Sequence, residues 1–459
     1  MESLKTSFPK KQTILLGGDI IMIIASFYFA PVIRFGVWLE PVVVFGFSDA
    51  LAMVVYLAAL YVFNFYNFEE HVYGMSYALR FPFVILGVNL LNSSLFYIFH
   101  LRPYNSGIIA ISGTVAMVLL LGWRLAFMRL LDSKRHPLKI LIVGAGITGK
   151  VLHGLLIGNR EYEVVGFIDD DEKRQGSLMN NVPVLGDSGR LMDIVKEKGI
   201  NKIIVAITKT IRPAIFQKLV EAKFSGVTVY EMPTFYEKVS GKIPVLHTNE
   251  MWLGYADIVG VKRNIYNVRL KKVFDKAFSL IGVLLSFPIM IATAALIKLE
   301  SPGPVLYLQK RVGWDEKEFD VIKFRSMRLD AEFNGAVWAQ ENDRRATRVG
   351  RIIRLLRIDE LPQLWNVLAG EMSFVGPRPE RPEFVNILKL EIPYYSLRHA
   401  VRPGITGWAQ VNYPYGSSKK DALEKLQYDL YYIKNMSMFL DFHILLKTVR
   451  VMLFRKGAR

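Results

Sequence analysis

The sequence contains no cysteine among its 459 residues. Disulfide bonds, thiolate catalysis and cysteine-ligated metal sites are therefore excluded. Acidic residues are also scarce, since 41 Asp and Glu stand against 58 Lys and Arg and leave a formal net charge of +17. Such an excess of positive charge suits a phosphate-containing substrate, an anionic membrane surface or nucleic acid.

Charged residues make up only 22% of the chain, against 52% hydrophobic residues. This composition is too apolar for an ordinary soluble enzyme. The apolar residues concentrate in four runs within residues 1–135: Thr13–Ile33, Ala50–Tyr66, Phe81–Phe99 and Gly107–Trp123. Each run approaches the roughly 17–25 residues that a helix needs to cross the hydrocarbon layer. We therefore expect a membrane protein with an α-helical, four-helix N-terminal membrane part.

Basic residues indicate how these four helices are oriented. They precede the first run and follow the fourth: Lys5, Lys10, Lys11, Arg129, Lys134, Arg135 and Lys139. By the positive-inside tendency, both ends of the membrane part face the cytoplasm. No small-residue cleavage site follows the first run, so we expect an uncleaved helix rather than a signal peptide. Asp19 lies inside this run, and we favour a structural contact with water or a neighbouring helix over a transport role.

Residues 136–260 change in character and predict a Rossmann-like α/β domain. The segment KILIVGAGITGK is a buried strand, a glycine-rich turn and a helix start, with Gly144, Gly146 and Gly149 in a G-x-G-x-x-G pattern. A second strand ends at Asp169, twenty residues after Gly149. Further strands near 201–207 and 227–232 alternate with helices near 189–198 and 213–223. This alternation indicates a small parallel sheet.

The glycine-rich turn has two interpretations. Its glycines allow a pyrophosphate to approach a helix N-terminus while Asp169 holds a ribose, which makes dinucleotide binding one candidate function. Alternatively, the turn only packs the strand against the helix. The Tyr-x-x-x-Lys pair used by short-chain reductases and epimerases is absent from this domain, because its one match is Tyr415–Lys419. We therefore do not expect the domain to be catalytic.

Residues 261–459 begin with another apolar run, Ala277–Ile297, which contains Pro288. Proline removes a backbone hydrogen bond and kinks or breaks a helix. Basic residues flank both ends of the run: Lys271, Lys272, Lys276, Lys298, Lys310 and Arg311. We expect a re-entrant helix over about 271–300 that keeps both flanks on the cytoplasmic side. An ordinary fifth span with a proline kink is the alternative.

The segment 350–384 is the richest in chemistry. Arginines recur every three residues and predict one helix face that leads into two adjacent carboxylates; the residues are Arg351, Arg354, Arg357, Asp359 and Glu360. Arg378 follows in a stiff Pro-Arg-Pro turn. Carboxylates hold Mg²⁺, arginine forks bind phosphate, and a carboxylate can be the nucleophile in phosphoryl transfer. A surface helix crossed by salt bridges is the alternative.

The segments IDELPQLWNVLAGEMSFVGPRPE, SPGPVLYLQKRVG and VRPGITGWAQVNY resemble the bacterial sugar transferase family, the monotopic polyprenyl-phosphate phosphoglycosyl transferases. The resemblance covers about 265–459. With the membrane helices and Rossmann-like domain, the chain resembles the long branch, the undecaprenyl-phosphate glucose or galactose phosphotransferases of exopolysaccharide and O-antigen synthesis. It implies an α+β catalytic domain that transfers a sugar-1-phosphate, with a hexose such as glucose favoured, from a UDP-sugar to undecaprenyl phosphate and releases UMP.

The resemblance also implies roles for individual residues. Asp359 is the nucleophile that forms a phosphosugar intermediate, and Glu360 together with Asp359 holds magnesium (Mg²⁺). Lys323, Arg378 and Arg402 match positions near the phosphates. Pro288 matches the proline that breaks the re-entrant helix, although Phe287 stands where the family often has Ser and Ser286 lies one step earlier.

The expected partners are a UDP-sugar, undecaprenyl phosphate and membrane lipid, with a homodimer suggested by the long branch and no nucleic acid. The expected location is the bacterial inner membrane, with a cytoplasmic catalytic domain and a C-terminal amphipathic helix at the interface. Soluble packing of that helix is the alternative. Two other functions remain open: a membrane-anchored nucleotide-sugar epimerase or dehydratase, and a non-catalytic regulator of polysaccharide assembly.

Overall fold

The computed structural model describes residues 10–36, 46–63, 65–66, 75–99, 106–132, 137–159, 161–208, 211–248, 250–262, 264, 266–328, 345–414, 416 and 418–453. The chain forms two compact units, Met1–Arg135 and His136–Arg459. Several residues used above to orient the membrane part lie outside the described residues: Lys5, Lys134 and Arg135. The orientation of the membrane part therefore stays a prediction.

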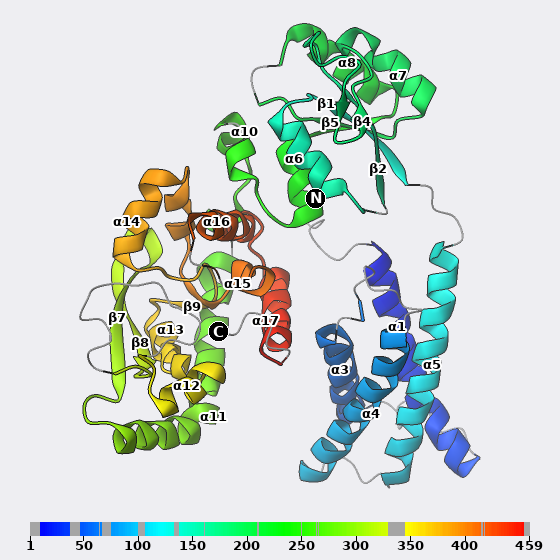
Figure 1. Ribbon diagram of the computed structural model, residues 1–459. Coiled ribbons are helices and arrows are strands. Elements are labelled where there is room, and N and C mark those ends of the chain that lie inside the picture. Colours follow the sequence, from blue (N-terminus) through cyan, green and yellow to red (C-terminus); the bar gives the residue numbers. More distant parts are fainter. Residues whose placement is uncertain are drawn as a thin grey trace. The chain divides into compact units, whose positions relative to one another are not determined.

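Four helices build the described part of the N-terminal unit (Figure 1): α1 (Lys10–Phe35), α3 (Phe47–Val62), α4 (Met75–Ile98) and α5 (Ser106–Asp132). They confirm the four predicted apolar helices. Helices α1, α4 and α5 are long and apolar enough to cross a membrane. Helix α3 has 16 residues, so at 1.5 Å per residue it is about 24 Å long and shorter than its apolar run. The four helices share one apolar core.

A buried ion pair joins α1 to α5. Arg124 pairs with Asp19, and the two side chains are 2% and 0% exposed. Its guanidinium also donates to the carbonyl oxygen of Phe65 at 2.7 Å and lies over the rings of Tyr66 and Phe81, 5.1 and 5.7 Å from their centroids. These contacts agree with the structural interpretation of Asp19. The sequence interpretation missed Arg124, which lies 105 residues away.

The α/β domain has a four-stranded parallel sheet in the order β2-β1-β5-β6. The strands are β1 (Leu138–Val143), β2 (Tyr162–Ile168), β5 (Lys202–Val205) and β6 (Thr228–Glu231). One face packs against α7 (Leu191–Lys198) and α8 (Pro213–Phe224), the other against α6 (Ile147–Leu156) and α9 (Met232–Ser240). A short hairpin, β3 (Leu178–Met179) and β4 (Val182–Pro183), follows β2. The parallel sheet is as predicted, because residues 140–143 of its central strand β1 form an apolar run that is buried on both faces.

The rest of the second unit mixes helices with short strands. Its strands are the antiparallel pair β7 (Leu306–Val312) and β8 (Glu318–Phe324) and the parallel pair β9 (Ser373–Val375) and β10 (Gly404–Thr406). Its helices are α10 (Glu250–Tyr255), α11 (Lys271–Glu300), α12 (Arg348–Leu355), α13 (Gln363–Ala369), α14 (Pro382–Glu391), α15 (Trp408–Asn412), α16 (Lys419–Lys434) and α17 (Met438–Leu453). The predicted boundary near residue 260 therefore lies inside one compact unit.

Helix α11 is bent but not interrupted. It is helical from Lys271 to Glu300 with Pro288 inside, and Figure 1 shows its two halves running in different directions. The Ser286 hydroxyl donates to the carbonyl oxygen of Gly282 at 2.7 Å. The expected break at Pro288 is therefore a bend within a continuous helix. Its outer side chains are exposed and apolar, including Leu285 at 76%, and the helix is long and apolar enough to cross a membrane.

Helix α17 is divided between a buried and an exposed face. Ile444 is fully buried in the core of this region. Phe439 and Phe442, in contrast, are 73% and 60% exposed. One face thus packs in the core of this region while the other leaves large apolar side chains exposed. The location of this helix at a membrane interface stays a prediction.

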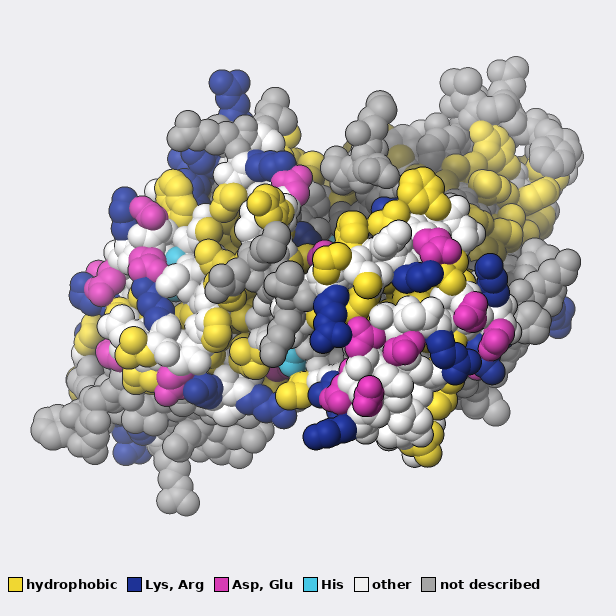
Figure 2. Space-filling model, turned by 90° about the horizontal axis from the view of Figure 1, so that it is seen from above, with side chains coloured by type: hydrophobic (Ala, Val, Ile, Leu, Met, Phe, Trp, Pro, Cys, Tyr) yellow, Lys and Arg dark blue, Asp and Glu magenta, His cyan; other side chains and the backbone are white. Residues whose placement is uncertain are grey.

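The surface charges are mixed. On the face drawn in Figure 2, Lys and Arg side chains alternate with Asp and Glu and with hydrophobic side chains. The expectation that the chain binds no nucleic acid stays a prediction.

Candidate active site

A cavity of about 990 Å³ opens in the second unit. Its wall comes from the β7–β8 hairpin, the turn after α12, the Pro-Arg-Pro turn, α15, α16 and α17. The charged side chains that line it include Arg311, Lys323, Arg354, Arg357, Asp359, Glu360, Arg378, Glu380, Arg381, Arg398, Lys425 and Asp429. Cations outnumber carboxylates in this lining, which suits a ligand that carries several phosphate charges.

A tight turn presents the two adjacent carboxylates to the cavity. Helix α12 ends at Leu355, and Arg357 adopts a left-handed backbone with φ of +58° before the 3₁₀ turn Ile358–Glu360. The prediction that Arg357 continues the helix face of Arg351 and Arg354 is therefore wrong. Arg354 and Arg357 line the cavity and Arg351 does not. A left-handed non-glycine residue is uncommon, and such backbone strain tends to cluster at functional sites.

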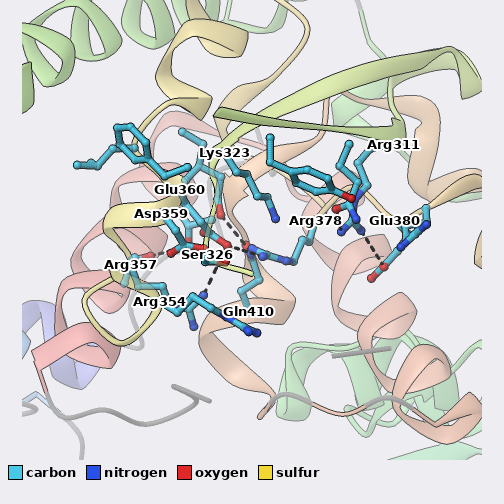
Figure 3. Close-up of a pocket in the computed structure, with 18 of the residues that line it drawn as sticks. Arg311, Lys323, Ser326, Arg354, Arg357, Asp359, Glu360, Arg378, Glu380 and Gln410 are labelled. Carbon is cyan, nitrogen blue, oxygen red and sulfur yellow. Dashed lines mark hydrogen bonds and ion pairs between the residues drawn. The ribbon is translucent and has the colours of Figure 1, made fainter. Parts of the chain in front are cut away.

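Cations surround the carboxylates. Figure 3 shows Asp359 and Glu360 between Arg354 and Arg357 on one side and Lys323 and Arg378 on the other. Arg378 donates from Nη2 to Glu360 Oε1 at 2.6 Å. Arg357 Nη1 lies 3.9 Å from the same oxygen.

The two carboxylates differ in their proton affinity. Burial opposes ionisation of Glu360, but the charge and hydrogen bond of Arg378 outweigh it and hold the pKa of Glu360 well below its usual range. Burial and the adjacent Glu360 charge raise the pKa of Asp359 to about 6. Burial lowers the pKa of Lys323 on β8 to about 8. At neutral pH both members of this adjacent pair are thus mainly ionised. Asp359 makes no hydrogen bond to any described residue.

The structure brings most of the predicted phosphate-binding residues together. Lys323 and Arg378 line the cavity with Asp359 and Glu360. Arg402 does not line it, and its guanidinium instead lies over the ring of Trp314, 5.8 Å from the centroid. The position of Arg402 does not support the prediction that it contacts the phosphates in this cavity. A residue can belong to a motif of the site while its side chain points away from the cavity.

The backbone of the glycine-rich turn in the α/β domain packs closely against itself. Gly144 has a φ of +112°, and a Cβ on Gly149 would lie 2.2 Å from the Gly144 carbonyl oxygen, so both positions require glycine. A Cβ on Gly146 would meet only the Arg174 guanidinium, at 3.7 Å. The glycines thus serve the close packing of β1 against α6.

Asp169 is already engaged by its own domain. Its Oδ2 accepts hydrogen bonds from the Ala145 backbone N–H at 2.7 Å and from Arg174 Nη1 at 3.1 Å. Its Oδ1 accepts from the Asp171 backbone N–H at 2.9 Å. A ribose would have to displace these contacts, so the geometry favours the packing interpretation. Dinucleotide binding stays a prediction.

Sequence reasoning missed several residues of the cavity. Arg311 donates to the Pro379 carbonyl oxygen at 3.0 Å, and it could have been found because it belongs to the SPGPVLYLQKRVG segment. Arg398 and Asp429 form a buried pair at 2.8 Å. No local signal marks Asp429, because it reaches the cavity only through the packing of α16.

Two carboxylates are available for a metal ion. The described residues contain no group of three or more His, Cys, Asp and Glu side chains that would hold one. Mg²⁺, however, is usually bound by one or two carboxylates together with waters and substrate phosphates. Asp359 and Glu360 supply such a donor set, and the carboxylate of Asp359 faces the cavity. The residues present therefore fit a Mg²⁺ ion that is shared with a polyphosphate substrate.

Two family models match the chain. The model described as bacterial sugar transferase matches residues 266–455, which include every cavity residue named above. The model described as PglD N-terminal domain matches residues 139–219, within the α/β domain.

Curated relatives match over parts of their length. A UDP-N-acetylgalactosamine-undecaprenyl-phosphate N-acetylgalactosaminephosphotransferase of Aeromonas hydrophila is 46% identical over 241 residues, 52% of this chain and 56% of that protein. A UDP-glucose:undecaprenyl-phosphate glucose-1-phosphate transferase of Xanthomonas campestris pv. campestris is 35% identical, over 62% of this chain and 59% of that protein. The chain thus spans between half and two thirds of these relatives.

A third relative is matched over most of its length. It is a putative undecaprenyl-phosphate N-acetylgalactosaminyl 1-phosphate transferase of Bacillus subtilis (strain 168), 53% identical over 129 residues, 28% of this chain and 72% of that protein. The residues that line the cavity lie within the part of the chain that the family model matches. The chain belongs to the bacterial sugar transferase family.

Proposed function

We propose that the chain transfers a sugar-1-phosphate from a UDP-sugar to undecaprenyl phosphate and thereby starts a lipid-linked glycan for exopolysaccharide synthesis. The observation that carries this proposal is the Asp359–Glu360 pair, which lies beside Lys323 and Arg378 in a cavity within the family-matched residues. Nucleophile, charge stabilisers and room for a polyphosphate meet there. The undecaprenyl-phosphate relatives named above support the same substrates.

The reaction proceeds in two displacements at one phosphorus. An oxygen of the Asp359 carboxylate attacks the sugar-bearing phosphorus, the bond to the UMP oxygen breaks, and UMP leaves with the electron pair. The sugar phosphate is then an acyl phosphate on Asp359. A phosphate oxygen of the lipid attacks the same phosphorus and the aspartyl oxygen leaves, which yields the undecaprenyl-diphospho-sugar and frees the carboxylate.

The surrounding cations serve the charge that develops during both steps. Arg378 and Lys323 stabilise the phosphoryl oxygens, as preformed donors do at developing negative charge. Glu360, held ionised by Arg378, keeps that guanidinium in place between turnovers. A Mg²⁺ ion held by Asp359 and Glu360 would supply further neutralisation of phosphate charge.

The acceptor phosphate lies at the level of the lipid headgroups, so the cavity must lie at a membrane surface. We infer that the bent helix α11 enters and leaves the membrane on the cytoplasmic side. Basic residues flank both of its ends, at Lys271 and Lys298, and a spanning helix would place one of these ends outside. The expected location is the bacterial inner membrane. A homodimer is expected because the chain resembles the long branch of the bacterial sugar transferase family.

The donor sugar has two candidates. Sequence resemblance favoured a hexose such as glucose, and the Xanthomonas relative carries that name at 35% identity. The relatives at 46% and 53% identity are both named for N-acetylgalactosamine. We therefore include UDP-N-acetylgalactosamine as the second candidate donor.

The test is UMP release by the purified full-length protein in detergent, with Mg²⁺, undecaprenyl phosphate and a panel of UDP-sugars. We expect lipid-dependent release with one donor and, without lipid, a protein mass gain of one sugar phosphate that Asp359→Asn abolishes. Glu172→Gln, an exposed acid in the α/β domain, is the matched control. Unchanged turnover in Asp359→Asn would overturn the nucleophile, and no release with any donor would overturn the function.

A further inference from the structure

We propose that Arg398 and Asp429 are positioning residues for this reaction. They hold the backbone of the Pro377-Arg378-Pro379 turn through the Arg378 carbonyl oxygen, so that the Arg378 guanidinium reaches Glu360 and the transferred phosphate. The inference rests on the proposed function and adds to it a pair of buried residues that the motifs did not indicate.

Arg398 is a buried hub beside the cavity. It lies in the 3₁₀ turn η7 (Tyr395–Ala400) and is 5% exposed. Its Nη2 donates both to the Arg378 carbonyl oxygen at 3.0 Å and to Asp429 Oδ2 at 2.8 Å. Its Nη1 donates to the Tyr395 hydroxyl at 2.6 Å. The guanidinium therefore joins three segments and ends on the backbone of Arg378.

The turn that it holds has few donors of its own. Pro377 and Pro379 have no backbone N–H, so the turn is held largely through its carbonyl groups. Three successive carbonyl oxygens accept from different segments: Pro377 from the Gly404 N–H at 2.9 Å, Arg378 from Arg398, and Pro379 from Arg311 at 3.0 Å. The contact from Arg398 holds the backbone of Arg378, the residue whose side chain reaches Glu360. This contact depends on Arg398 and on its partner Asp429.

Stability alone does not explain a charge pair at this place. Asp429 is 1% exposed, and burying two charges costs desolvation free energy that apolar residues of similar size would avoid. The planar fork of arginine offers what apolar residues lack, because it directs two donors in fixed directions at once. Here it binds a carboxylate with one contact and orients the Arg378 peptide with another.

The test is a double-mutant cycle on the activity of the full chain. Arg398→Lys keeps the charge but loses the fork, and we expect kcat to fall by about ten- to a hundredfold, as for a catalytic group displaced by about an ångström. If Arg398 acts through Arg378, the same substitution in an Arg378→Lys background lowers kcat by a clearly smaller factor. An equal factor in both backgrounds would overturn the proposal.

A second ion pair provides the matched control. Lys271 and Asp441 are each 11% exposed and bond to each other, and neither lines the cavity. Asp441→Asn should lower the melting temperature while its effect on kcat combines multiplicatively with Arg378→Lys. If Arg398→Lys does not fold, Asp429→Asn replaces it in the cycle with the same expected non-additivity.

The wild-type protein separates the two proposals. If wild type shows no lipid-dependent UMP release, the proposed function fails and this inference fails with it. If wild type is active and Arg398→Lys is folded and equally active, the positioning role fails alone and the function stands.

Discussion

Asp169 and Asp359 were both expected to serve a bound ligand, and the structure separates them. Asp169 receives hydrogen bonds from Ala145, Asp171 and Arg174. Asp359 receives none from the described residues and borders a cavity of about 990 Å³. Three of the roughly four acceptor positions of the Asp169 carboxylate are thus occupied by its own domain. Arg378 donates its hydrogen bond to Glu360 rather than to Asp359. The carboxylate of Asp359 therefore stays available to react with a substrate.

The largest expected difference between the two sites is in activity. Asp359→Asn should lower UMP release by about a thousandfold or more, because an amide cannot form the acyl phosphate. Asp169→Asn should leave the rate within about twofold, since its contacts are internal to the α/β domain. Both rates are measured with the same donor and lipid. Comparable losses of activity in the two variants would contradict the conclusion that Asp359 is catalytic and Asp169 structural.

Arg378 and Arg402 both belong to motifs of the family, but only Arg378 lines the cavity. Arg378→Gln should lower kcat by about a hundredfold, as expected for a preformed donor to a developing oxyanion. Arg402→Gln should change kcat little, because its guanidinium lies over Trp314 outside the cavity. A large loss of kcat in a folded Arg402→Gln protein would show that Arg402 does act in the active site.

Asp19 is a further carboxylate committed to structure. Arg124→Gln leaves it buried beside a neutral partner, and breaking such a pair typically costs about 3–5 kcal/mol. We expect a lower melting temperature in detergent, with the kcat of the protein that remains folded unchanged. The double variant Asp19→Asn with Arg124→Gln should regain part of the loss, and failure to do so would argue against the pair as the cause.

Asp169→Asn should destabilise its domain by about 1–3 kcal/mol if the buried Ala145 N–H is left without its acceptor. Hydrogen exchange of the β1–α6 segment measures this directly. Glu172→Gln serves again as the control, because Glu172 is exposed. Equal exchange in both variants would mean that the three contacts of Asp169 contribute little.

A further expected effect is on the pH dependence of stability. Burial and the neighbouring Arg398 lower the pKa of His399 to about 4 from 6.5. Between these values the unfolded chain binds more protons than the folded one, so stability falls as the pH is lowered from about 6.5 to 4. Melting temperatures across this range measure the slope. His399→Asn should flatten it relative to wild type if the histidine is responsible.

Features encoded by neighbouring residues were predictable. Asp359 and Glu360 are adjacent, so any fold that exposes one brings the other near it. Gly144 precedes the N-cap of α6 and Gly149 lies in its first turn, five residues further on. The burial of β1 follows from its apolar run over residues 140–143. The apolar helices follow from run length alone, although α3 is shorter than its run.

The sequence by itself determined the apolar helices, the parallel sheet and the carboxylate pair, because each follows from local spacing, hydropathy or backbone freedom. Tertiary structure decided that Arg357 leaves the helix of Arg354, that Arg311 rather than Arg402 faces the cavity, and that Asp169 is engaged. It also decided the pairs Asp19–Arg124 and Arg398–Asp429, whose members lie 105 and 31 residues apart. Such contacts depend on how distant elements pack, and the direction in which a side chain points is set by that packing.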